Sequence, residues 1–113
     1  MDILFKTNKF RKECNDFKRL QKKYGQRRAE LIRRRLDDLR AADILADIGH
    51  LPPARCHELH GDREGQLAVD LKYPYRLIFE PANDPIPRKA DSGLDWAKVT
   101  AILIISVEDY HGQ

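Results

Sequence analysis

Two histidines and an arginine supply the side-chain types that cleavage of RNA through its own 2′-hydroxyl requires. The reaction needs a base for the hydroxyl proton, an acid for the leaving 5′-oxygen, and a cation that stabilises the charged phosphorane. His60 and His111 can exchange protons near neutral pH, because an unperturbed imidazole titrates at roughly 6.5. Arg76 can hold a phosphate in its planar guanidinium.

Four further residues could extend such a site. Tyr110 offers a ring on which an unstacked base can lie, and Asp109 could orient a histidine or contact a base edge. Arg55 and Arg63 would add positive charge at the rim. Simpler interpretations exist: chain ends usually fray, and Arg76, which alternates with apolar residues in YRLIF, could be the solvent side of a strand.

Cysteine and histidine could also indicate a zinc site formed by Cys56, His57, His60 and His111. Adjacent residues of a strand point to opposite faces, so Cys56 and His57 do not readily share one metal. We predict no metal and no cofactor, and a packing or hydrogen-bonding role for His57. Two cysteines, Cys14 and Cys56, are too few for a disulfide framework and are expected to be reduced.

The elements that must position these residues begin with a strand and two helices. The apolar run at residues 2–6 favours a strand, and Thr7 or Asn8 can cap a helix that continues to about Tyr24. Gly25 can end that helix, and a second helix is predicted over residues 26–43. Apolar residues recur at spacings of three and four, which predicts a helical hairpin with one buried face.

Positive charge is concentrated in this first part of the chain. Residues 1–45 contain 14 Lys and Arg against 7 Asp and Glu, a balance of +7, whereas residues 46–113 contain 7 against 11, a balance of −4. Such a surface can attract a polyanion such as RNA, although a solvated helix face is the simpler interpretation. The predicted RNA-binding residues of the helices, expected to face outward, are Lys22, Lys23, Arg33, Arg34 and Arg35.

After Pro52 and Pro53 the periodicity changes to two, which predicts strands at residues 55–59, 66–71, 75–80 and 98–107. A polar insertion covers about residues 81–97, and Trp96 is expected to anchor it to the domain. The order βααββββ predicts a single α+β domain over residues 1–113, with a helical hairpin packed on a curved, mainly antiparallel sheet.

The stretch RCHELHGDREGQLAVDLKYPYRLIFEP and the later EDYH resemble the HigB-like toxins of the RelE/ParE superfamily. In those toxins an H-x-L-K-G-D-like hairpin, a Y-R-[IL]-x-F strand and a terminal D-Y-H follow one another in this order. The resemblance extends over the whole chain in element order. The chain departs from the pattern at His60, where the relatives usually carry lysine, and in the length of its insertion.

The resemblance implies a RelE-like fold and a type II toxin that cuts messenger RNA on the ribosome, with a basic helical face on ribosomal RNA. It also implies a helix-turn-helix antitoxin of the HigA kind as the partner. The active patch that it implies comprises Arg55, His57, His60, Arg63, Arg76, Asp109, Tyr110 and His111.

Two other classes of function remain open. A ParE-like poison of DNA gyrase needs no terminal histidine, so the D-Y-H ending argues against it. A non-catalytic domain that binds nucleic acid or antitoxin is compatible with the histidine at position 60. No apolar run is long enough to span a bilayer, and charge interrupts the N-terminus too early for a signal peptide, so we expect a soluble, cytoplasmic protein.

Overall fold

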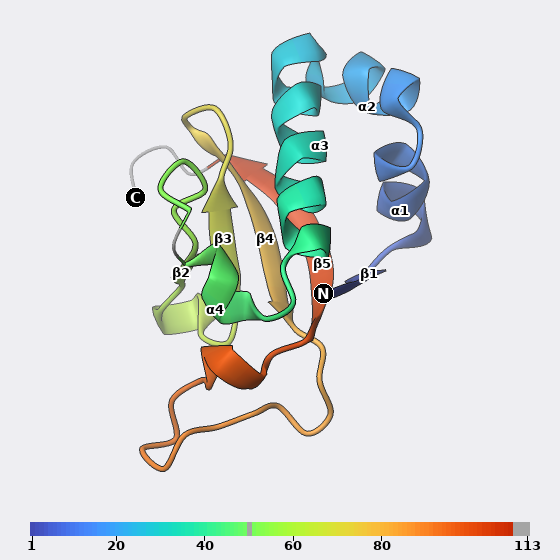
Figure 1. The fold of residues 1–113 in the computed structure, drawn as a ribbon. Helices are drawn as coiled ribbons and strands as arrows, with labels where there is room; N and C mark the ends of the chain where they lie inside the picture. The colour runs from blue at the N-terminus through green and yellow to red at the C-terminus, as the bar shows by residue number, and fades with distance from the viewer. Residues whose placement is uncertain (50, 110–113) are drawn as a thin grey trace.

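A five-stranded sheet with helices on one face forms the domain in the computed structural model, which describes residues 1–49 and 51–109 (Figure 1). Its order is β1-β5-β4-β3-β2, with β1 parallel to β5 and the other neighbours antiparallel. The α+β class and the mainly antiparallel sheet are thereby confirmed. The strands are β1 (Asp2–Phe5), β2 (His57–Glu58), β3 (Leu67–Asp70), β4 (Tyr75–Pro81) and β5 (Ala101–Asp109).

The helices of the described residues are α1 (Asn8–Cys14), α2 (Phe17–Tyr24), α3 (Gln26–Ala41) and α4 (Leu45–Ile48). The prediction of one continuous helix up to Tyr24 is wrong. The side chain of Asp16 accepts hydrogen bonds from the backbone N–H groups of Lys18 and Arg19 and so begins α2 as a new helix. Gly25, with a φ of 83°, ends α2 as predicted.

The main core lies between α3 and the covered face of the sheet. Ile32, Leu36 and Leu39 of α3 are buried with Leu77 and Phe79 of β4, which confirms the predicted inward face of this helix. A smaller cluster of Leu59, Ala68 and Ile78 lies on the opposite face of the sheet. The strand β4 is therefore packed on both faces.

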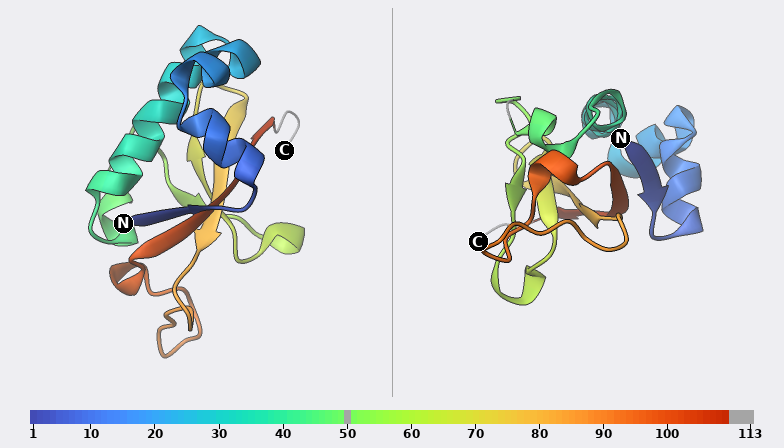
Figure 2. Two further views of the ribbon diagram at one scale, coloured as in Figure 1. Left: turned by 90° about the vertical axis from the view of Figure 1, so that its right-hand side faces the viewer. Right: turned by 60° about the horizontal axis from the view of Figure 1, so that its bottom comes forward.

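The two faces of the sheet differ in what lies against them. In both views of Figure 2, α3 lies on one side of the sheet, while the short 3₁₀ helix η1 (Gly61–Arg63) lies on the other. Among the described residues no α-helix covers this second face, which we call the open face. Within the same part of the chain, no helix is long and apolar enough to cross a membrane.

The insertion (about residues 81–97) forms a loop beyond the lower end of the sheet in Figure 1 and returns to it before β5. It ends in the 3₁₀ helix η2 (Trp96–Lys98), where Trp96 Nε1 donates a hydrogen bond of 2.9 Å to Glu58 Oε2. Asn83 Oδ1 accepts from the backbone N–H groups of Thr100 and Ala101. The predicted anchoring role of Trp96 is confirmed.

Candidate functional site

Arg76 lies on the open face of β4 between two acidic residues. Leu77 and Phe79 of the same strand pack in the core on the helix-covered face, so alternation along the strand places Arg76 on the other face. The strand register puts it opposite Asp70 of β3 and Glu108 of β5. Arg76 is only 6% exposed, so the alternative of a solvated side chain is wrong. Its guanidinium is therefore buried within the domain, beside the strands that carry Asp70 and Glu108.

Glu108 joins the short helix η1 to the sheet. Both guanidinium N–H groups of Arg63 donate to its carboxylate, at 2.5 and 2.6 Å, and Ser106 Oγ donates to the same carboxylate at 2.9 Å. The hydrogen bonds from Arg63 are the main reason why the pKa of Glu108 is lowered, and the positive charge of Arg76 acts in the same direction. Sequence reasoning missed Glu108, because alternation along β5 shows which residues share its face but not that Glu108 lies opposite Arg76.

Asp70 connects Arg55 to the same face. Arg55 Nε lies 3.3 Å from Asp70 Oδ2, and Arg55 adopts a positive φ of 45° that turns the chain into β2. The Nδ1 atom of His57 lies 2.7 Å from the carbonyl oxygen of Arg55. The expected structural hydrogen bond of His57 is therefore confirmed, and Arg55, Arg63 and Arg76 are brought to one face together with two carboxylates.

The remaining predicted residues of the patch lie elsewhere or outside the described chain. His60 is exposed at the start of η1, where its carbonyl oxygen accepts from the backbone N–H of Arg63. Asp109 pairs with Tyr75 in the register, so pleating places it on the opposite face from Arg76. Tyr110 and His111 lie outside the described residues.

Arg35 does not belong to the exposed basic surface, and the prediction that it faces outward is wrong. It is 7% exposed and donates through Nε to the carbonyl oxygen of Asp70 at 2.8 Å and through Nη2 to that of Pro53 at 3.1 Å. Its Nη1 atom lies 3.6 Å from Asp38 Oδ2. Burial is the main reason why the pKa of this guanidinium is lowered. Through these hydrogen bonds Arg35 connects α3 to β3 and to the loop that contains Pro53.

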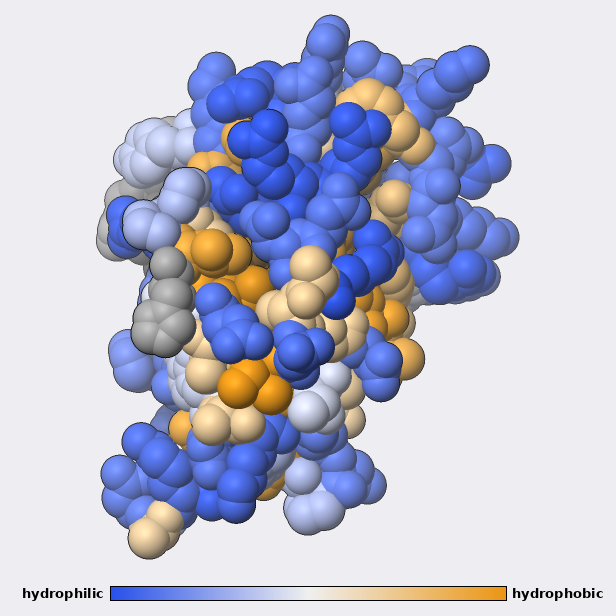
Figure 3. All heavy atoms as spheres, in the orientation of Figure 1, coloured by the Kyte–Doolittle hydropathy of each residue, from blue (hydrophilic) through white to orange (hydrophobic). Residues whose placement is uncertain are grey.

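The other predicted basic residues are exposed but differ in their surroundings. Arg33 stacks over the ring of Phe17 at 4.2 Å, and with Arg34 it borders a hollow that also contains Glu30, Asp37 and Asp38. The outer face of α3 is thus mixed in charge. The α1–α2 face is more basic, because its hollow is lined by one carboxylate, Glu13, and by Lys9, Lys12, Arg19, Lys22 and Lys23. Figure 3 shows hydrophilic side chains over α2 and α3.

A third hollow links the basic α1–α2 surface to the sheet. Its volume is about 340 Å³, and its walls include Lys9 and Lys23 from the helices and Ser106 from β5. It lies where β1 ends, because β1 pairs with β5 only as far as Ile104. Since Ser106 donates to Glu108, the lysines of the helices adjoin the residues around Arg76. A polyanion could contact both regions at once.

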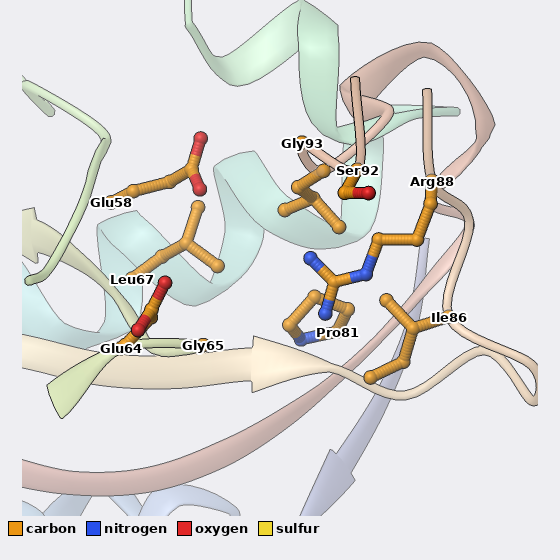
Figure 4. Close-up of a pocket in the computed structure, with 10 residues that line it drawn as sticks. Glu58, Glu64, Gly65, Leu67, Pro81, Ile86, Arg88, Ser92 and Gly93 are labelled. Atoms are coloured by element: carbon orange, nitrogen blue, oxygen red, sulfur yellow. The ribbon is translucent and has the colours of Figure 1, made fainter. Parts of the chain in front are cut away.

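A pocket at the other end of the sheet contains none of the predicted site residues. Figure 4 shows Glu58 and Glu64 on its hairpin side and Arg88 reaching over Pro81 from the insertion. Its volume is about 260 Å³. We assign it no chemistry, because its carboxylates are exposed and Glu58 already accepts the hydrogen bond of Trp96.

The cysteines do not add a nucleophile to the site. Both are free thiols, and burial raises the pKa of Cys14 and of Cys56 to about 12. A thiol with such a pKa carries almost no thiolate at neutral pH and is a poor nucleophile. Within residues 1–49 and 51–109 no group of three or more His, Cys, Asp or Glu side chains is arranged to hold a metal ion.

These features define a small α+β domain with an oriented arginine cluster on the open face of its sheet. No protein-family model matches the sequence, and no curated protein matches it. Its function has to be inferred from the residues, their geometry and the motifs described above.

Replacing Glu108 with glutamine should make stability less sensitive to acid. The folded state lowers the pKa of Glu108, so the stabilisation is present above the ordinary value of 4.5 and is lost as the pH falls through the folded value. Urea unfolding at pH 7 and at about pH 3 should therefore show a smaller loss for Glu108→Gln than for the parent. An equal loss in both proteins would mean that the Arg63 pair does not operate in solution.

Proposed function

We propose that this protein is the toxin of a type II toxin–antitoxin pair, a ribosome-dependent endoribonuclease with a RelE-like fold. One structural observation carries the proposal: Arg76 is buried on the strand between Asp70 and Glu108, and Arg55 and Arg63, which pair with these carboxylates, belong to the same open face. Arginine in a fixed orientation suits a planar, bidentate contact to a phosphate. The HigB-like motifs described above supply the type of reaction.

In the proposed mechanism the scissile phosphate lies on Arg76, with the charge of Arg63 nearby. One of His60 and His111 takes the 2′-hydroxyl proton, and the other protonates the leaving 5′-oxygen. The chain itself supports a role for His111, because it follows Glu108 by only three residues. Tyr110 would stack on a base. Asp109 lies on the opposite face of the sheet from Arg76 and is given no contact with the scissile phosphate. The reaction needs no cofactor.

The ribosome is the proposed site of action. The basic hollow of α1 and α2 supports this assignment, because its lysines continue toward Ser106 and the open face through the adjoining hollow. In this proposal the helices bind ribosomal RNA while the sheet acts on the message. A helix-turn-helix antitoxin, the proposed partner, rests on the motif resemblance alone.

A second candidate is a non-catalytic domain of the same fold that binds RNA or antitoxin. One observation favours it: Arg63 and Arg55 are each paired with a carboxylate. RNA would have to displace Glu108 from Arg63 before the Arg63 guanidinium could bind a phosphate. Cleavage of RNA separates the two candidates.

A translation system of purified components tests the proposal. The protein should shorten the message only when ribosomes are present, and it should leave supercoiling by DNA gyrase unchanged. The exposed Arg88 on the insertion provides a matched control, because Arg88→Ala removes one cation far from Arg76 and should cleave like the parent. An intact message with inhibited gyrase would indicate a gyrase poison, and an intact message with active gyrase would favour the non-catalytic alternative.

A further inference from the structure

Two connections at one end of the molecule border an open hollow that the proposed mechanism does not use. The α2–α3 turn forms one side and the β3–β4 turn the other, and the volume between them is about 380 Å³. Both turns lie at the same end of the molecule in Figure 1. Its walls are Tyr24, Gly25, Gln26, Arg27, Arg28, Lys72, Tyr73 and Tyr75.

Arg28 forms a fixed wall of this hollow. Its guanidinium lies 3.8 Å from the ring centre of Tyr75 and 5.2 Å from that of Tyr24. Its Nε atom donates to the carbonyl oxygen of Tyr24 at 3.1 Å. A guanidinium that already contacts two rings loses little further conformational entropy when it binds a ligand.

Tyr73 presents a large aromatic surface to solvent at the rim. It is 76% exposed, and the neighbouring Lys72 and Arg27 are exposed as well. Arg27 Nη1 lies 3.9 Å from Glu30 Oε2, a long and exposed ion pair that contributes little free energy. Among the described residues that line the hollow, three are cationic, three are tyrosines, and none carries a carboxylate or an aliphatic side chain.

This combination matches single-stranded nucleic acid better than it matches a protein. Bases of single strands stack on aromatic rings and on arginine planes, while lysine and arginine contact the phosphates. An apolar protein surface would find no aliphatic partner here. The hollow also adjoins the groove that Lys9, Lys23 and Ser106 share, because Tyr24 lines both.

We propose that this hollow is a second binding site for single-stranded RNA. One base stacks on Tyr73, and the neighbouring phosphates contact Lys72 and Arg27. Tyr73 precedes Arg76 by three residues, so the hollow and the open face lie at neighbouring positions of the chain. The identity of this RNA as message rests on the proposed function, whereas the binding itself requires no cleavage.

Fluorescence anisotropy with a labelled 2′-O-methyl oligouridine of eight nucleotides tests the site, because this probe is single-stranded and cannot be cleaved through its 2′-oxygen. Tyr73→Ala should weaken binding about tenfold, in the range of one lost base-stacking contact. Tyr73→Phe keeps the ring and should bind within about twofold of the parent. Ile86→Ala, which changes an exposed apolar residue on the insertion, is the matched control and should bind like the parent.

The charge component has its own test. Lys72→Gln should reduce the salt dependence of binding by about 0.7 in the logarithmic slope, the contribution of one phosphate contact on a single strand. Lys89→Gln, an exposed lysine on the insertion, should leave the slope unchanged. A polyglutamate peptide should compete poorly; if it competes as well as the oligonucleotide, the hollow binds an acidic protein segment instead.

The outcomes separate this inference from the proposed function. Parent-like binding by Tyr73→Ala overturns the RNA site, even if the protein cleaves ribosome-bound message. If binding depends on Tyr73 but the protein leaves the message intact, the RNA site is supported and the proposed nuclease activity is contradicted. Equal affinity for duplex RNA of the same length would also overturn the inference, because paired bases cannot stack on the ring.

Discussion

Replacing Arg76 with alanine is expected to lower the cleavage of ribosome-bound message by about a hundredfold or more. This is the scale of losing one donor that stabilises developing charge in an active site. The structure adds a second consequence, because Arg76 lies between Asp70 and Glu108 on neighbouring strands. Arg55 and Arg63 still pair with these carboxylates in the variant, but the buried positive charge between them and the packing of the Arg76 side chain are lost, so the variant should also be less stable.

Arg76→Lys separates the two effects. Lysine keeps the positive charge between the carboxylates, so thermal unfolding should occur near the parent temperature. It lacks the planar fork, so cleavage should recover only in part. Both variants have to be measured at a temperature where circular dichroism shows them folded. Full cleavage by folded Arg76→Ala would move the phosphate site away from the open face.

Replacing Arg35 with alanine should lower the free energy of unfolding by about 3 kcal/mol, the cost of leaving buried hydrogen-bond partners unsatisfied. The carbonyl oxygens of Asp70 and Pro53 would lose the donor that now reaches them from α3. The unfolding temperature should fall by on the order of 10 °C for a domain of this size. Thermal and urea unfolding measure the change directly.

Arg34 provides the matched control, because it is the adjacent arginine of the same helix and is exposed. Arg34→Ala should change stability by no more than about 0.5 kcal/mol, as is usual for surface substitutions. If the two variants were equally stable, Arg35 would not connect α3 to the sheet in solution.

The periodicity of apolar residues predicted most of the fold. Spacings of three and four identified the inward face of α3, and alternation identified β3 and β4. The break after Cys14 was missed because the apolar stripe continues through it, while the cap at Asp16 depends on the conformation of one residue. Helix α4 was missed because four residues are too few for a periodic pattern.

The site was less predictable, because it depends on which residues from distant strands become neighbours. Sequence patterns placed Arg76 on one face of a strand but gave no register with Asp70 or Glu108. Arg35 shows the same limit: helical spacing alone does not reveal that two backbone carbonyl groups meet its guanidinium. The hollow at Tyr73 joins two turns that are far apart in the sequence.

We propose above all that this protein cuts RNA by using the 2′-hydroxyl of the RNA as the nucleophile. The chemistry of the cut ends tests this proposal most directly. Fragments from a message bound to purified ribosomes should end in a 2′,3′-cyclic phosphate or a 3′-phosphate, and a 2′-O-methyl group at the cut nucleotide should abolish cleavage. An intact message, or fragments that end in a 3′-hydroxyl, would contradict the account.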